Sequence, residues 1–174
     1  GRGTNHRLTL PGASPTAPQK IGKTSRGERS ARASAANTPQ TPWRSTPMPM
    51  RKNAGLGMAR VLELVDEIAW SHKPHAVGAA GHIDVYPNSR NVVPGKVVFT
   101  IDFRSPELAI IEDMNARLRQ GAQKICDEMG LEVTFEKVGG FDPVEFDAGC
   151  VSAVRNAAER LGYSHRDLIS GAGH

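Results

Sequence analysis

The chain has 174 residues, of which 39% are hydrophobic and 5% aromatic, and its formal net charge is +4. This length and apolar content are enough for one modest domain, and no apolar run approaches the roughly 20 residues that a membrane span needs. Two cysteines, Cys126 and Cys150, are too few for a disulfide framework, so we expect reduced thiols and a cytoplasmic protein.

The first 45 residues differ in composition from the rest of the chain. Their only large apolar residues are Leu8, Leu10, Ile21 and Trp43. Burial of so little apolar surface cannot offset the entropy of ordering, so residues 1–45 are predicted to be a disordered tail. Residues 1–50 carry eight basic residues and one acid, whereas residues 51–174 carry fourteen basic residues and seventeen acids. The basic charge therefore belongs to the tail.

A basic tail can attract nucleic acid or an anionic membrane surface. Here the basic residues are scattered, and no aromatic residues are interleaved among them for base stacking. We therefore expect neither nucleic acid nor membrane as a partner, and a basic-tail binding protein is kept as an alternative.

Helical periodicity begins after the Pro-rich run at residues 46–50. Apolar residues recur at intervals of three and four between Met58 and Ala69, which predicts a helix from about Asn53 to His72. Pro74 follows closely and disfavours helix at the residue before it, so the helix is expected to end there.

Two alternating patterns follow this helix. Ile83 and Val85 alternate with polar residues, and so do the apolar residues from Val97 to Phe103, which predicts two strands that each turn one face to a core. The stretch from Pro87 to Gly95 between them is rich in turn formers and too long for a two-residue hairpin. We predict a structured loop there.

The rest of the chain reads as helix, strand and helix. Ser105-Pro106-Glu107 is a favourable helix start, because Ser can cap and Pro suits the first helical position. The apolar stripe of this helix runs to Met129, and Gly130 is a typical stop signal. A strand from Leu131 to Glu136 and a last helix from about Ala148 to Leu161 follow.

The order helix, strand, strand, helix, strand is typical of a split β-α-β motif of the ferredoxin-like kind. The predicted class is α+β, with two helices on one face of an antiparallel sheet. The first strand of the motif should precede the helix at Asn53, where the sequence is rich in Arg and Ser. We therefore predict that this strand is missing.

Few residues suggest chemistry by their spacing. The six histidines are His6, His72, His75, His82, His165 and His174, and no pair has the helical spacing of a zinc site. His72 and His75 lie near a predicted helix end, where a dipole interaction or solvent exposure is a better interpretation than a metal ligand. Arg104 lies beside Asp102 in the strand pattern, and Asn91 lies in the preceding loop. Either can be an ordinary surface residue or a substrate contact.

Four segments together resemble a known family. They are Ser45–Lys52 (STPMPMRK), Pro87–Gly95 (PNSRNVVPG), Phe99–Ser105 (FTIDFRS) and Ser170–His174 (SGAGH). The same motifs occur in this order in bacterial N-carbamoyl-L-amino-acid hydrolases, allantoate amidohydrolases and β-ureidopropionases. The resemblance covers about three quarters of the chain, from Ser45 onwards.

The resemblance implies a two-domain enzyme whose lid domain is inserted in the catalytic domain and makes a homodimer contact. It implies a divalent-metal site, with Zn²⁺ or Mn²⁺, in which the metals polarise the ureido carbonyl and activate a water. In the family pattern Asn91 and Arg104 bind the substrate carboxylate, and His174 faces the reacting carbonyl. The resemblance thus favours the substrate interpretation of Arg104.

This sequence also departs from the family. The family's metal ligands and catalytic glutamate lie in segments that have no counterpart here, so no metal ligand can be named. Thr41–Arg44 stands where the family has Asp-Ala-His-Ala-Gly, so a second lid histidine is missing. We interpret residues 1–44 as an out-of-frame translation or a gene-model artefact, with a natural disordered extension as the alternative. Translation of the gene in its other frames decides between them.

These observations predict a disordered tail over residues 1–45, a lid and dimerisation domain over residues 46–140, and over residues 141–174 the start of a return into a catalytic domain. The expected function is that of part of a metal-dependent amidohydrolase, with no turnover by this chain alone. The alternative is a catalytically inactive, stand-alone dimerisation module.

Overall fold

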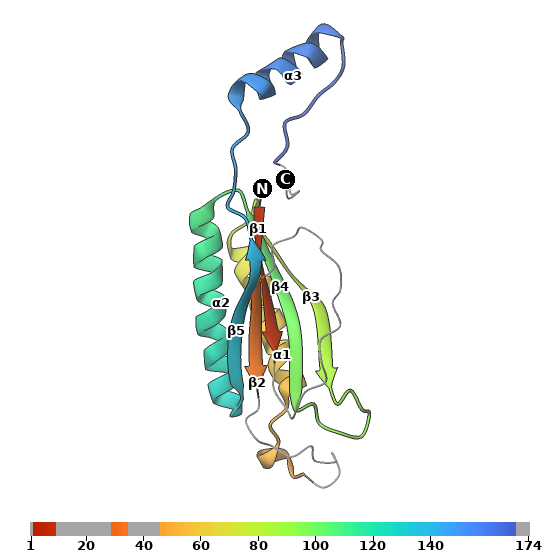
Figure 1. Cartoon of the computed structure of the whole chain (residues 1–174), viewed down its shortest axis with the longest axis vertical. Coiled ribbons are helices and arrows are strands. Elements are labelled where there is room, and N and C mark those ends of the chain that lie inside the picture. The colour runs from red at the N-terminus through yellow and green to blue at the C-terminus, as the bar shows by residue number, and fades with distance from the viewer. Residues whose placement is uncertain (1, 10–28, 35–45, 170–174) are drawn as a thin grey trace.

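The computed structural model of the chain describes residues 2–9, 29–34 and 46–169 (Figure 1). Its elements are β1 (Arg2–Thr9), β2 (Arg29–Ser34), a 3₁₀ turn (Met48–Met50), α1 (Ala54–Ser71), β3 (Val77–Tyr86), β4 (Lys96–Ser105), α2 (Leu108–Met129), β5 (Glu132–Gly140) and α3 (Ala148–Arg160). The sheet is antiparallel, and α1 and α2 pack on one of its faces. This confirms the predicted α+β class.

α1 forms because a capping residue precedes an apolar stripe. The Asn53 side chain accepts a hydrogen bond from the backbone N–H of Leu56 at 3.2 Å, which satisfies one of the donors left unpaired at a helix start. The stripe buries Val61, Val65 and Ile68. His72 follows the last helical residue, so the bounds predicted from the sequence are confirmed.

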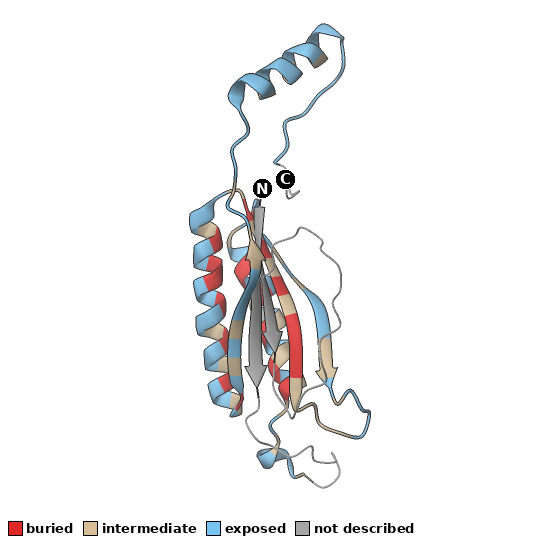
Figure 2. Ribbon diagram, in the orientation of Figure 1, coloured by how far each residue is buried: buried red, intermediate tan, exposed pale blue. Residues whose placement is uncertain are grey.

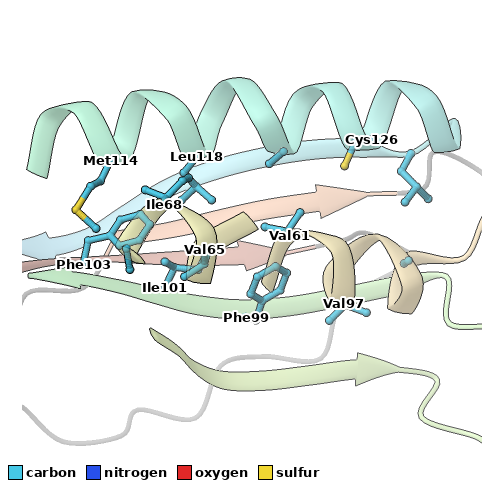
Figure 3. Close-up of a cluster of buried hydrophobic side chains, with 14 of the residues drawn as sticks. Val61, Val65, Ile68, Val97, Phe99, Ile101, Phe103, Met114, Leu118 and Cys126 are labelled. Carbon is cyan, nitrogen blue, oxygen red and sulfur yellow. The ribbon is translucent and has the colours of Figure 1, made fainter. Parts of the chain in front are cut away.

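β4 supplies the sheet's share of the core. Its helix-facing residues Val97, Phe99, Ile101 and Phe103 are all fully buried. They point towards Val61, Val65 and Ile68 of α1 and Met114 and Leu118 of α2 (Figure 3). Figure 2 shows the same pattern, with buried residues on β4 and on the inner faces of the two helices. Full burial of one such side chain is worth about 1.5–3 kcal/mol, so this layer is the main source of the fold's stability.

The start of α2 differs from the sequence prediction. The helix begins at Leu108, and Glu107 occupies the capping position without a side-chain hydrogen bond. Ser105 is the last residue of β4 and is buried, and its Oγ accepts the backbone N–H of Glu107 at 3.2 Å. The serine therefore stabilises the turn between strand and helix instead of capping the helix. Gly130, with φ 62°, ends α2 as predicted.

The N-terminal part contains two strands where the sequence predicted that the first strand is missing, and the rest of the predicted disordered tail lies outside the described residues. The backbones of β1 and β2 lie in the sheet, and each pairs antiparallel with both β4 and β5. Without a strand between them, β4 and β5 would leave facing rows of unpaired N–H and C=O groups. Backbone pairing satisfies these groups whatever the side chains are, so composition alone did not reveal these strands.

α3 lies beyond the end of the sheet (Figure 1) and has no buried residue. Asp147 caps its first turn, and the side chain of this residue accepts a hydrogen bond from the backbone N–H of Cys150 at 2.8 Å. Val154 on this helix is 73% exposed, so its apolar face is not part of the core. Within the described residues, no helix combines the length and the apolarity that crossing a membrane requires.

Candidate substrate-binding site

Arg104 is held in one orientation by Asp102 on the face of β4 opposite the helices. Its Nε and Nη2 atoms donate to Oδ2 of Asp102 at 2.9 and 2.6 Å. This hydrogen bond, with the charge of Asp102, raises the pKa of Arg104 above its ordinary value. The guanidinium is therefore a permanent cation with a defined plane, which suits recognition of a carboxylate.

The carboxylate of Asp102 is only partly satisfied. Its Oδ1 atom is buried and has no hydrogen-bond partner among the described residues. A buried, unpaired carboxylate oxygen is costly, so the neighbouring cation contributes to keeping Asp102 in place. Asp102 and Arg104 thus form one unit, and removing either side chain disturbs the other.

Arg104 lines a cavity of about 450 Å³ at the end of the sheet where β3 begins and β4 ends. The other walls are formed by the segment before β3, with His75, and by the segment from Arg166 to Ile169. Asp167 also lines the cavity, but its carboxylate is bound by Arg155 at 2.6 Å. The lining thus contains two arginines and one histidine, and its single carboxylate is paired with Arg155, a balance that favours an anion.

Asn91 does not lie at this cavity. It belongs to the loop between β3 and β4, whereas Arg104 is next to the last residue of β4. Eight residue steps from Lys96 to Arg104, at about 3.4 Å each in an antiparallel strand, separate the two ends by roughly 27 Å. The structure thus places Asn91 and Arg104 at opposite ends of one hairpin, which the sequence pattern did not show.

His174, the third predicted site residue, lies outside the described residues, as does the whole Ser170–His174 motif. Ile169, which immediately precedes that motif, lines the cavity with Arg104. Sequence reasoning missed Arg166 and did not connect His75 with this site. For Arg166 the usable signal was its position four residues before the motif, and for His75 there was no sequence signal.

His72 takes part in a polar cluster that joins α1 to α2. Its Nε2 lies 2.8 Å from Oδ2 of Asp113 and 3.3 Å from an Nη1 atom of Arg117, which also donates to Oγ of Ser71 at 2.6 Å. These contacts link the end of one helix to the side of the other. The structure therefore gives His72 a structural part in the helix pair.

No metal site can be assembled from the described residues. Among residues 2–9, 29–34 and 46–169, no group of three or more His, Cys, Asp or Glu residues could hold a metal ion. The donor set that Zn²⁺ or Mn²⁺ requires is three or four such groups around one point. The described residues do not fit the divalent metal that the resemblance implies.

Known proteins provide an independent comparison. No family model matches the chain. An N-carbamoyl-L-amino-acid amidohydrolase of Rhizobium meliloti is 57% identical over 130 residues, which cover 75% of this chain and 31% of that protein. The allantoate amidohydrolase of Escherichia coli K12 is 32% identical over 130 residues, 75% of this chain and 32% of its own length.

Solved structures point the same way. The crystal structure of an amidase of the hydantoinase/carbamoylase family from Burkholderia vietnamiensis matches 99% of this chain and 36% of its own, with a TM-score of 0.78 and 38% identity. The chain spans about a third of the length of the curated relatives it matches. Over that third, the chain belongs to the family of N-carbamoyl-L-amino-acid and allantoate amidohydrolases.

Proposed function

We propose that this chain is the substrate-binding lid domain of an amidohydrolase that hydrolyses the ureido or amide C–N bond of N-carbamoyl-L-amino acids or allantoate. The observation that carries the proposal is Arg104, which Asp102 orients at the wall of a cavity that favours anions. Both substrate classes carry a carboxylate, and a fixed guanidinium matches a carboxylate with two parallel hydrogen bonds. Arg104 therefore binds and orients the substrate.

The other two site residues have complementary roles in the proposal. Asn91 offers an amide, which both donates and accepts hydrogen bonds, to the carboxylate end of the substrate. His174 faces the carbonyl that reacts, and it follows Ile169 of the cavity wall by five positions. Domain boundaries at residues 45 and 140 complete this proposal.

A divalent metal, Zn²⁺ or Mn²⁺, enters the proposal for the longer relatives, where it would polarise the carbonyl. Because the described residues offer no ligand cluster, we assign no metal-dependent step to this chain. Its contribution is to bind the carboxylate and hold the substrate in place. We expect the purified chain to release no ammonia from N-carbamoyl amino acids or allantoate, even with added metal.

A homodimer explains how Asn91 and Arg104 serve one substrate. β3 lies at one edge of the sheet, next to β4, and no described strand pairs with its outer edge. Antiparallel pairing of this edge with β3 of a second copy sets the Tyr86 end of one strand beside the Val77 end of the other. The Asn91 loop of one copy then lies near the Arg104 cavity of its partner, which removes the separation of roughly 27 Å.

The carboxylate proposal is tested by titrating the ¹⁵N-labelled chain with N-carbamoyl-L-alanine and with its neutral carboxamide. We expect the carboxylate to shift amide signals near His75 and Ser105, and the carboxamide to bind at least about tenfold more weakly, as loss of a charged hydrogen bond implies. Arg104→Gln removes the preference, and Arg119→Gln, which deletes a cation stacked on Phe135, keeps it. Equal binding of the two ligands contradicts the proposal.

The dimer proposal is tested by mixing Asn91→Ala and Arg104→Gln chains, each of which damages every site in its own homodimer. Random exchange gives heterodimers with one intact site, so carboxylate binding returns at about a quarter of the sites. A monomer by sedimentation, or no recovery on mixing, counts against it. A dimer that binds no carboxylate favours the alternative, an inactive dimerisation module.

A further inference from the structure

The backbone registers show that β1 and β2 face the same residues of the sheet. Leu8 and Ala31 each pair with Phe99 of β4, and each also pairs with Phe135 of β5. The equivalence continues along the strands, since Thr9 and Arg32 both pair with Val98 on one side and Thr134 on the other. The two segments thus have one common alignment in the sheet.

A strand inside a sheet has one neighbour on each side. The other side of Phe99 is already occupied by Ile83 of β3. The position between β4 and β5 therefore has room for one strand, although two segments of the chain match it in the same antiparallel direction.

We propose that the space between β4 and β5 is a strand-binding groove, and that Arg2–Thr9 and Arg29–Ser34 occupy it in turn, one at a time. The groove selects its occupant through the backbone, because the two segments carry different residues at equivalent positions. Leu8 is equivalent to Ala31, and Thr9 is equivalent to Arg32. Backbone hydrogen bonds to both neighbours supply the binding, as in strand addition to a sheet edge.

The two occupants cover different parts of β4. Arg2–Thr9 pairs from Val98 to Ser105, whereas Arg29–Ser34 pairs from Lys96 to Ile101. With the second segment in the groove, Asp102–Arg104 pairs with β3 alone. Exchange therefore determines whether the end of β4 that carries Arg104 is paired on both sides. This conclusion does not depend on the proposed substrate.

Thr134 gives a single reporter position for both states, because it is exposed and faces Thr9 in one register and Arg32 in the other. Directly paired residues are close enough for a disulfide. In a Cys150→Ser background we would combine Thr134→Cys with Thr9→Cys, with Arg32→Cys, and with both. Off-register controls replace these partners by Leu8→Cys and Ala33→Cys, because a shift of one residue moves the thiol to the opposite face.

In a glutathione redox buffer we expect both in-register pairs to link. We expect the variant with cysteine at positions 9, 32 and 134 to give a mixture of two products, one joining position 134 to position 9 and the other joining it to position 32. The helix content measured by circular dichroism should be unchanged. Amides in the segment 102–105 should exchange more slowly when position 9 is linked than when position 32 is linked. One product only, no product, off-register linkage at equal yield, or equal exchange in the two linked forms overturns the proposal.

Discussion

Gly78→Ala tests whether the core is packed as described. Gly78 lies directly opposite Phe103 in the β3–β4 pairing. A methyl group at this position would lie 2.7 Å from Cε1 and 2.8 Å from Cδ1 of the Phe103 ring, and 3.1 Å from Cβ of Ala69. Carbon atoms in contact prefer about 3.5–4.0 Å. The ring must therefore move.

The ring has little space to move into. Phe103 is fully buried and lies beside Ile68 and Met114 (Figure 3). Overpacking of this kind lowers the free energy of unfolding by about 1–3 kcal/mol. Alanine also reduces the conformational entropy of the unfolded chain relative to glycine, which offsets about 0.4–1 kcal/mol of that loss. The net loss is about 1–2 kcal/mol, which in urea lowers the unfolding midpoint by roughly 0.5–1 M.

Urea unfolding followed by circular dichroism measures this loss. Gly95→Ala is the matched control, because a methyl group there meets nothing within 4 Å, and we expect it to leave stability unchanged or raise it by up to about 1 kcal/mol. Phe103→Leu in the Gly78→Ala background should recover part of the loss, with a coupling energy of about 0.5–3 kcal/mol. If Gly78→Ala is as stable as Gly95→Ala, the packing of Phe103 on Gly78 is refuted.

Two further predictions concern individual side chains. Burial raises the pKa of the Cys126 thiol to about 11, with a smaller contribution from the charge of Asp127. Iodoacetamide at pH 8 should therefore label only the exposed Cys150 in the folded chain, and both cysteines in urea. Labelling of both cysteines in the folded chain contradicts this prediction. Hydrogen bonds from the backbone N–H and side chain of Cys150 lower the pKa of Asp147 below 3.8. Its stabilisation of α3 is therefore present above that value and lost as the pH falls through the lowered pKa, so NMR should show fraying of α3 in acid, and Asp147→Asn should abolish this pH dependence.

Local signals in the sequence determined most of the fold. The apolar stripe of α1, with Asn53 before it and His72 after it, located a helix because helix formation depends on residues three and four positions apart. Alternation located β4, and Gly130 located the end of α2. The family motifs, which are also local, predict Arg104 as a substrate contact, and the structure adds its ion pair with Asp102.

Tertiary structure decided what depends on contacts between distant segments. Arg166 and His75 come to one cavity with Arg104 only because three separate segments meet at the end of the sheet. Asn91 and Arg104 are thirteen positions apart in the sequence, yet a hairpin holds them at opposite ends, since an extended strand carries the chain away at about 3.4 Å per residue. The groove between β4 and β5 also depends on long-range pairing. It binds a strand through backbone groups, which are the same in every sequence, so the side-chain pattern did not reveal its occupants.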